Sequence, residues 1–394
     1  MLSKCINKHI NRAVNSMAMS NFMRFSTAQQ TFQAKDLKIE ERQVKLQKPD
    51  TSRGDPYTFG KVFTDHMLSI DYTADNGWEA PKIVPYQQIP VAITASSLHY
   101  GISAYEGISV VKNQSNGTPQ AFRIRDNLHS FYMGNDHLDM PSFDPNELLG
   151  CIKSLVNIDQ SWFPEVNGAD SQLYVRVNHV STDPMLGVKS PKFTKLYAII
   201  SPTTFKNKSL KVKCAYDVFK NWPLGHGQFR LSGNLGPLVP QMMDAKLNGF
   251  DDVLWLLDDY VNEMTVLNVF ALLKTRYGTL ELITPPNDGC IFNGTVRQSI
   301  IDLKDEILKE KNVKLVERQL SIHEIISASR EERLLELFGG ATSSNIQSIS
   351  RVNYRDETMD LQGRETPFAN YLNKKLLGIM TGSDSHPWVT SFKN

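Results

Sequence analysis

The sequence lacks long apolar runs and has no excess of charge of either sign. No stretch of its 394 residues approaches about eighteen uninterrupted apolar residues, so we expect no membrane span. A net charge of +1 is far below the cationic excess that a duplex-binding surface needs, so nucleic acid is not expected as a partner. The hydrophobic share of 41% and charged share of 22% are those of an ordinary globular protein, and the length favours two domains.

Cysteine is scarce, and no two cysteines have C-x-x-C spacing. This pattern argues against a disulfide framework or a zinc site and predicts reduced, buried thiols. His99 and His226 also lack companions at metal-ligand spacing, so we interpret both as structural or surface residues and predict no metal site. The four cysteines are Cys5, Cys151, Cys214 and Cys290.

Residues 1–35 contain no aspartate or glutamate, although they carry several lysines and arginines. Ile6, Ile10, Val14 and Met17 fall on one helical face, which predicts a basic amphipathic helix. This composition is typical of a mitochondrial transit peptide and predicts a protein of the mitochondrial matrix, while a basic tail without regular structure is the alternative.

The remainder predicts an α/β protein. Short β-type runs alternate with helical spacing, and a polar, proline-bearing break begins at Ser201. The expected segments are a leader over 36–56, a small α+β domain over 57–200, a linker over 201–209 and a large domain over 210–394. The expected strands include 82–86, 108–111, 173–177, 196–200, 253–257 and 280–284.

Helices are predicted at four places. Asp144 as N-cap and Pro145 at the first helical position predict a helix that begins at 145. Apolar spacing predicts helices near 295–311 and 366–380, and the apolar residues over 334–338 predict the end of another.

A glycine-spaced loop over 225–236 is the most unusual stretch. Its four glycines can take positive φ and approach a ligand closely, so we expect the loop to present Arg230. Two turns, over 288–297 and 338–344, could bind one anion through backbone amides, although ordinary caps or turns are the alternative. Glu263 has apolar neighbours, so it is either buried and paired or a solvated strand end.

The order and spacing of these stretches resemble the branched-chain amino acid aminotransferase family from about residue 57 to the end. The resemblance implies a fold-type IV pyridoxal phosphate enzyme: a small α+β domain, a larger α/β-barrel-like domain, the cofactor between them, and a homodimer. The stretches that carry it are 62–67, 97–101, 105–107, 173–176, 233–234, 252–256, 284–289 and 338–339.

By position, the resemblance also assigns site residues. It implies that Glu263 partners the pyridine nitrogen of the cofactor. The implied phosphate ligands are Gly294, Thr295, Val296 and Thr342. The implied substrate contacts are Tyr100, Tyr174, Arg176 and Ala341.

The sequence departs from the family at the residue on which the chemistry depends. The family's motif K-x-G-G-N-Y-G appears over 230–236 as R-L-S-G-N-L-G, so Arg230 stands where the family has the lysine that forms the Schiff base and moves the α-proton. A guanidinium, with a pKa above about 12, is never the free amine that attacks an aldehyde, so we expect no covalent cofactor. The other departures are Ser130 for a phosphate-binding arginine, Leu235 for a tyrosine, Asn293 for a proline, and Ser344 and Gln347 for a C-x-x-C.

Three hypotheses follow. The first is a mitochondrial aminotransferase fold with lost or nearly lost activity, kept as a structural, assembly or regulatory component and paired with itself or with a paralogue. The second is a working transaminase of leucine, isoleucine or valine with 2-oxoglutarate, which needs a substitute amine; Lys220 and Lys246 are nearest in sequence. The third is a module that holds the cofactor or an amino acid non-covalently through Glu263 and the turn amides.

Overall fold

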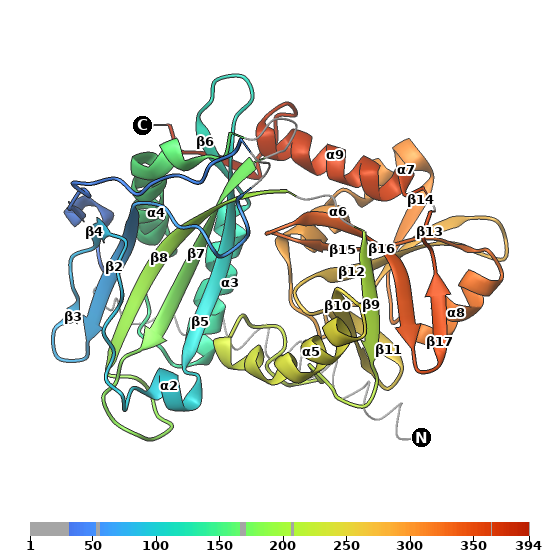
Figure 1. Ribbon diagram of the computed structural model, residues 1–394, viewed down its shortest axis with the longest axis horizontal. Coiled ribbons are helices and arrows are strands. Elements are labelled where there is room, and N and C mark those ends of the chain that lie inside the picture. The colour runs from blue at the N-terminus through green and yellow to red at the C-terminus, as the bar shows by residue number, and fades with distance from the viewer. Residues whose placement is uncertain (1–30, 53–55, 166–170, 206–208, 364, 394) are drawn as a thin grey trace.

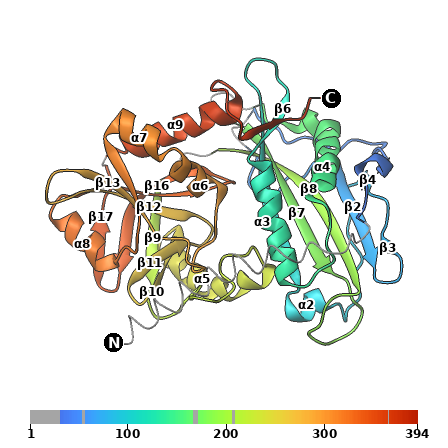
Figure 2. The same cartoon turned by 180° about the vertical axis from the view of Figure 1, so that it is seen from behind.

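The computed structural model describes residues 31–52, 56–165, 171–205, 209–363 and 365–393. Their strands form two sheets that stand side by side, with helices packed on each (Figure 1; Figure 2 shows the view from behind). This is the α/β architecture predicted from the sequence. Among the described residues, no helix has the length and apolar character needed to cross a membrane.

The first sheet is antiparallel except for one edge strand, and its order is β1-β4-β2-β8-β7-β5-β6-β18, with β3 paired to β2. Its strands are β1 Lys38–Ile39, β2 His66–Thr73, β3 Gly77–Trp78, β4 Lys82–Pro85, β5 Ser103–Lys112, β6 Pro119–Phe122, β7 Ser171–Ser181, β8 Phe193–Thr204 and β18 Val389–Ser391. The helices that precede or cover it are α2 Ser96–Tyr100, α3 Ile124–His137 and α4 Pro145–Asp159, with 3-10 turns at Ala34–Asp36 and Gln160–Trp162.

The helix α4 begins where the sequence predicts. The Asp144 side chain accepts a hydrogen bond from the Asn146 N–H, and Pro145 occupies the first helical turn. Leu148, Ile152 and Leu155 are buried against the first sheet and form part of its core.

The second sheet is barrel-like. Strand β11 pairs with both β10 and β12, so the path β11-β10-β9-β16-β15-β12 closes on itself, and β13 and β14 extend it while β17 pairs with β16. The strands are β9 Leu210–Ala215, β10 Asp252–Leu257, β11 Tyr260–Met264, β12 Asn268–Lys274, β13 Leu280–Thr284, β14 Val313–Glu317, β15 Leu334–Ala341, β16 Asn345–Tyr354 and β17 Glu357–Asp360. The helices are α5 Val239–Leu247, α6 Thr295–Asp302, α7 Lys304–Lys311, α8 Ile322–Arg330 and α9 Pro367–Thr381, with 3-10 turns at Ser232–Asn234 and Gly236–Leu238.

Two predicted helices of this half are wrong. The single helix over 295–311 is two helices, because the backbone at Leu303 (φ −84°, ψ 7°) leaves the helical region, although Ile300 and Ile307 are both buried in one core. The helix end over 334–338 lies in strand β15, which pairs with β12 and β16. A buried strand and a buried helix segment have similar apolar content, so periodicity could not separate them.

Some described residues near the boundaries of the predicted segments lie in regular structure. Phe32 is buried in the core of the first sheet, and the Ala34 N–H donates to Glu147, so the last residues assigned to the transit peptide belong to the folded body. Residues 201–204, expected in the linker, are the last residues of β8. Strand β18 returns to the first sheet, where Thr390 pairs with Ala121, so that sheet contains residues from both ends of the chain.

Candidate functional site

The loop over 225–236 lies against the first sheet, and the segment that leads into α5 runs between the two sheets in Figure 1. Leu231 forms a bridge with Ala104, and the Tyr105 N–H donates to the Arg230 carbonyl at 3.0 Å. A Cβ on Gly101 would lie 3.2 Å from the Gly233 Cα, so close approach is a real requirement here. Positive φ is not, because none of the four loop glycines has it.

Arg230 is enclosed by an acid and an aromatic ring. Its Nε lies 3.0 Å from Glu106 Oε1, and its guanidinium carbon lies 3.6 Å from the centroid of the Phe292 ring. The Arg230 side chain is 13% exposed and that of Glu106 is fully buried. The arginine therefore has a counter-charge and a stacking surface, although its Nε and the second oxygen of Glu106 make no hydrogen bond.

The pKa values of this pair follow from burial and mutual attraction. Burial raises the pKa of Glu106, and Arg230, the Gly107 N–H and the Ser130 hydroxyl offset part of that rise. Burial alone would lower the pKa of Arg230, but Glu106, Tyr105 and Tyr174 together hold it above its usual value. The guanidinium stays protonated, so it supplies charge and no nucleophile.

Glu263 is buried and paired, at the end of β11. Its Oε1 accepts from Lys220 Nζ at 2.8 Å and from Asn221 Nδ2 at 3.0 Å. Its Oε2 accepts from Asn268 Nδ2 at 3.2 Å and from the Phe292 N–H at 3.0 Å. A carboxylate has about four acceptor positions, so the protein supplies a donor for each of them.

The hydrogen-bond donors of Lys220 are likewise all paired within the protein. Besides Glu263, its Nζ donates to the carbonyls of Met264 at 3.2 Å and Thr265 at 2.9 Å, and its side chain is 8% exposed. An ammonium group has three donors, and all three are used. Lys246 is exposed on α5.

The predicted phosphate ligands come together at the start of α6. Gly294 is the N-cap, with no side-chain cap, and the hydroxyls of Thr295 and Thr342 are 3.2 Å apart. A Cβ on Gly294 would lie 2.4 Å from Asn268 Oδ1, so a larger residue here would require the Asn268 side chain, which donates to Glu263, to move. Val296, the fourth predicted phosphate ligand, is buried in α6, and Ala341, a predicted substrate contact, is buried at the end of β15 next to Thr342. We name this cluster, residues 294–296 and 341–342, the anion end.

Of the four predicted substrate contacts, Tyr174 and Arg176 lie together, Ala341 lies at the anion end, and Tyr100 lies elsewhere. The Arg176 guanidinium carbon is 3.6 Å from the centroid of Tyr105, and the Tyr174 hydroxyl lies over Gly107, where a Cβ would be 1.9 Å away. Tyr100 is 42% exposed on α2, where its hydroxyl accepts from the Gly187 N–H at 3.1 Å.

Sequence reasoning missed the acidic partner. Glu106 lies in β5, whose other residues are almost all buried, and an acid inside an apolar run is the signal that could have marked it as buried and paired. Phe292 contacts Arg230, and Asn221 contacts Glu263. Neither residue carries such a signal in the sequence, because only the folded chain brings these segments together.

The remaining thiols and histidines have structural surroundings. Cys151, Cys214 and Cys290 are unpaired and buried, and burial raises the pKa of Cys151 and of Cys290 to about 12. His226 Nδ1 is 2.8 Å from His137 Nε2, and His99 is exposed. Among the described residues, no group of three or more potential ligands is placed to hold a metal ion.

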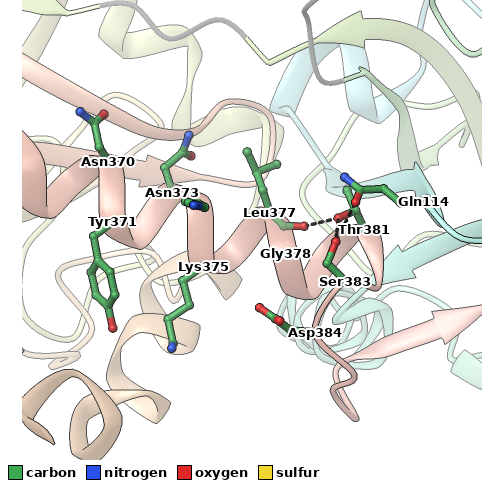
Figure 3. Close-up of a pocket in the computed structure, with 11 residues that line it drawn as sticks. Gln114, Asn370, Tyr371, Asn373, Lys375, Leu377, Gly378, Thr381, Ser383 and Asp384 are labelled. Atoms are coloured by element: carbon green, nitrogen blue, oxygen red, sulfur yellow. Dashed lines mark hydrogen bonds between the residues drawn. The ribbon is translucent and has the colours of Figure 1, made fainter. Parts of the chain in front are cut away.

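A polar depression of about 620 Å³ lies on the outer side of α9 (Figure 3). Its polar groups are largely used within the protein: Ser383 Oγ donates to Gln114 Oε1 at 2.7 Å, and Lys375 Nζ contacts Glu306 and Glu310 of α7. It contains none of the predicted site residues.

Comparison with known proteins places this geometry in a family. The family described as "Amino-transferase class IV" matches residues 103–352. The mitochondrial branched-chain-amino-acid aminotransferase of Bos taurus is 34% identical over 371 residues, which cover 92% of each chain. The chain belongs to the branched-chain aminotransferase family.

Other branched-chain aminotransferases give the same result. The mitochondrial enzyme of Schizosaccharomyces pombe is 33% identical over 84% of this chain and 79% of its own, and the cytosolic enzyme of Ovis aries is 34% identical over 91% and 94%. The solved structure of the Thermobaculum terrenum enzyme in its PLP-form matches with a TM-score of 0.67 at 19% identity, over 84% of this chain and 99% of that chain. The fold is therefore that of fold-type IV branched-chain aminotransferases, which are typically dimers.

Class IV aminotransferases bind pyridoxal phosphate, so the described residues can be tested against that group. The anion end fits, because unpaired amides at a helix start and two hydroxyls suit a phosphate. The rest does not fit. Arg230 offers no amine, and the acceptor positions of Glu263 already have four protein donors.

Proposed function

We propose that this protein is a branched-chain aminotransferase homologue with lost or strongly impaired transaminase activity, retained as a structural, assembly or regulatory component in the mitochondrial matrix. One observation carries the proposal: Arg230 stands at the Schiff-base position, and its guanidinium is neutralised by Glu106 and stacked on Phe292. Such a group can hold the loop in place but cannot attack an aldehyde.

The substitutions around Arg230 support the same proposal. The Ser130 hydroxyl, at the position of the family's phosphate-binding arginine, interacts with Glu106. Leu235, at the position of a tyrosine, packs beside the cluster that contains Trp255. The mitochondrial names of several relatives and the acid-free N-terminal segment support the location. Dimerisation, with itself or with a paralogue, needs no catalytic lysine.

An active transaminase would need a substitute amine. Lys220 has all three donors engaged, and Lys246 is exposed on α5. The preserved anion end favours instead a second candidate function, the non-covalent binding of a phosphate-bearing ligand.

Absorbance and reductive trapping test the proposal. Purified protein is mixed with pyridoxal phosphate, its visible spectrum is recorded, and the mixture is treated with borohydride and analysed by peptide mass spectrometry. We expect no reducible imine band and no pyridoxyl-lysine at Lys220 or Lys246. The variant Lys220→Arg is the matched control, because it keeps the charge and removes the amine.

A band that borohydride abolishes, with the adduct on Lys220 and absent from Lys220→Arg, would establish the working transaminase instead. Co-purification of the protein from mitochondria tests the assembly role. Recovery only as a free dimer, with no associated protein, would contradict it.

A further inference from the structure

Lys220 lies in the segment that follows β9. In this segment aromatic side chains are exposed and the lysine side chain is buried, which is the opposite of the usual distribution. Its neighbours Phe219 and Trp222 are 46% and 52% exposed, whereas the Lys220 side chain is directed inward and nearly buried. Burying an ammonium is costly unless it is paired and hydrogen-bonded. The three acceptors around Nζ meet that requirement, so this lysine is held in one defined position.

That position faces the acid to which the family resemblance assigns the pyridine nitrogen. Lys220 Nζ is a cationic N–H donor 2.8 Å from Glu263 Oε1, which is the kind of contact that a pyridinium N–H would make. Asn221, Asn268 and the Phe292 N–H complete the shell, so Glu263 keeps no acceptor position for a ligand.

We propose that the Lys220 ammonium occupies the position at Glu263 that the cofactor's pyridinium N–H would take. The protein thereby closes this end of its own pocket, and only the anion end remains able to bind a ligand. The inference rests on the proposed function and extends it, because it concerns non-covalent binding, whereas Arg230 concerns the covalent bond. A pocket closed in this way should recognise a phosphate group and gain little from the ring attached to it.

The test compares two probes, pyridoxal phosphate and inorganic phosphate, by calorimetric titration of the full chain. For the wild type we expect either no measurable pyridoxal phosphate binding or an affinity within about tenfold of that for inorganic phosphate, because the ring adds no charge-assisted contact. The variant Lys220→Met exposes Glu263 Oε1 and should bind pyridoxal phosphate at least about tenfold more tightly than the wild type, with unchanged phosphate affinity. Borohydride treatment of the bound cofactor should leave no pyridoxyl adduct on any lysine.

Lys213→Met is the matched control, because Lys213 pairs with Asp244 in a partly exposed position, and this change should alter neither affinity. Lys220→Met is expected to fold, since Glu263 keeps three donors. If it does not fold, the wild-type comparison decides alone.

Two outcomes overturn the inference: wild-type protein that binds pyridoxal phosphate more than about a hundredfold more tightly than phosphate without a reducible band, or an unchanged affinity in Lys220→Met. A reducible adduct on a lysine would overturn the proposed function instead, so the two failures are distinguishable.

Discussion

The two ends of this site use their polar groups in opposite ways. At the anion end, the start of α6 has no side-chain cap, and the hydroxyls of Thr295 and Thr342 lie within hydrogen-bond distance of each other. At the other end, which we call the cationic end, each carboxylate already holds a cation of the same chain: Arg230 on Glu106 and Lys220 on Glu263. The comparison shows that binding geometry and reactive chemistry are separable, because one end can keep its shape while the other is filled by ion pairs.

Restoring the family's reactive residues at the cationic end should have the largest effect, because it would remove the difference in reactivity from the active relatives. Arg230→Lys alone is expected to give no turnover of leucine with 2-oxoglutarate, because the new ammonium would pair with buried Glu106 and the phosphate would still lack its arginine. Adding Ser130→Arg and Lys220→Met, the second of which frees Glu263 for the ring nitrogen, should produce a reducible imine and turnover about 10²- to 10⁴-fold above the background rate measured with the single variant. Steady-state assays and borohydride trapping measure both. Turnover by Arg230→Lys alone would show that Ser130 and Leu235 are not disabling.

Removing the acid at the cationic end should have the next largest effect. Glu106→Gln leaves the Arg230 guanidinium buried without a counter-charge, which should lower the free energy of unfolding by about 3–5 kcal/mol in denaturant titration. Glu79→Gln, which breaks an exposed pair with Lys82, is the control and should cost at most about 1 kcal/mol. Equal losses in the two variants would mean that the Glu106 pair is not the anchor of the loop.

At the anion end, a comparable change should matter far less. Thr342→Val removes one hydroxyl–hydroxyl hydrogen bond, so the free energy of unfolding should fall by only about 1 kcal/mol. Thermal unfolding of Thr342→Val beside Glu106→Gln measures the contrast. A loss at Thr342 as large as that at Glu106 would remove the distinction between an open end and a filled one.

Lowering the pH should slightly destabilise the packing of the loop over 225–236, which contains His226 and Arg230. It should leave the anion end unchanged. Burial and His226 lower the pKa of His137 below its usual value, against an opposing effect of Asp136. The unfolded chain therefore binds the proton more readily, so the contact between the two rings stabilises the protein above about pH 6.5 and is lost as the pH falls through and below that value. The expected loss is below about 1 kcal/mol because His137 is only partly buried and solvent screens its charge.

Thermal midpoints measured between pH 8 and pH 5 should converge for wild type and His137→Asn at the acidic end, while the exposed His99→Asn tracks the wild type throughout. An undiminished difference at low pH would assign the His137 contact no role in holding the loop.

Local signals predicted much of the fold, and they failed where distant segments decide the structure. Pro145 and its cap fix the start of α4 because they act within one turn of the chain. The residues over 334–338 form a strand because β12 and β16 pair with them, which no window of sequence reports. The same division holds for the site. Arg230 could be singled out from its loop, whereas the contacts of Lys220 with Glu263 depend on the closed barrel.

Strand β18 has a consequence for the order in which the molecule can be built. It pairs with β6, and its Thr390 lies opposite Ala121, although the whole second sheet separates them in the chain. The edge of the first sheet at β6 therefore stays open until residues 389–391 have been synthesised. A nascent chain that lacks these residues exposes an unpaired strand at that edge.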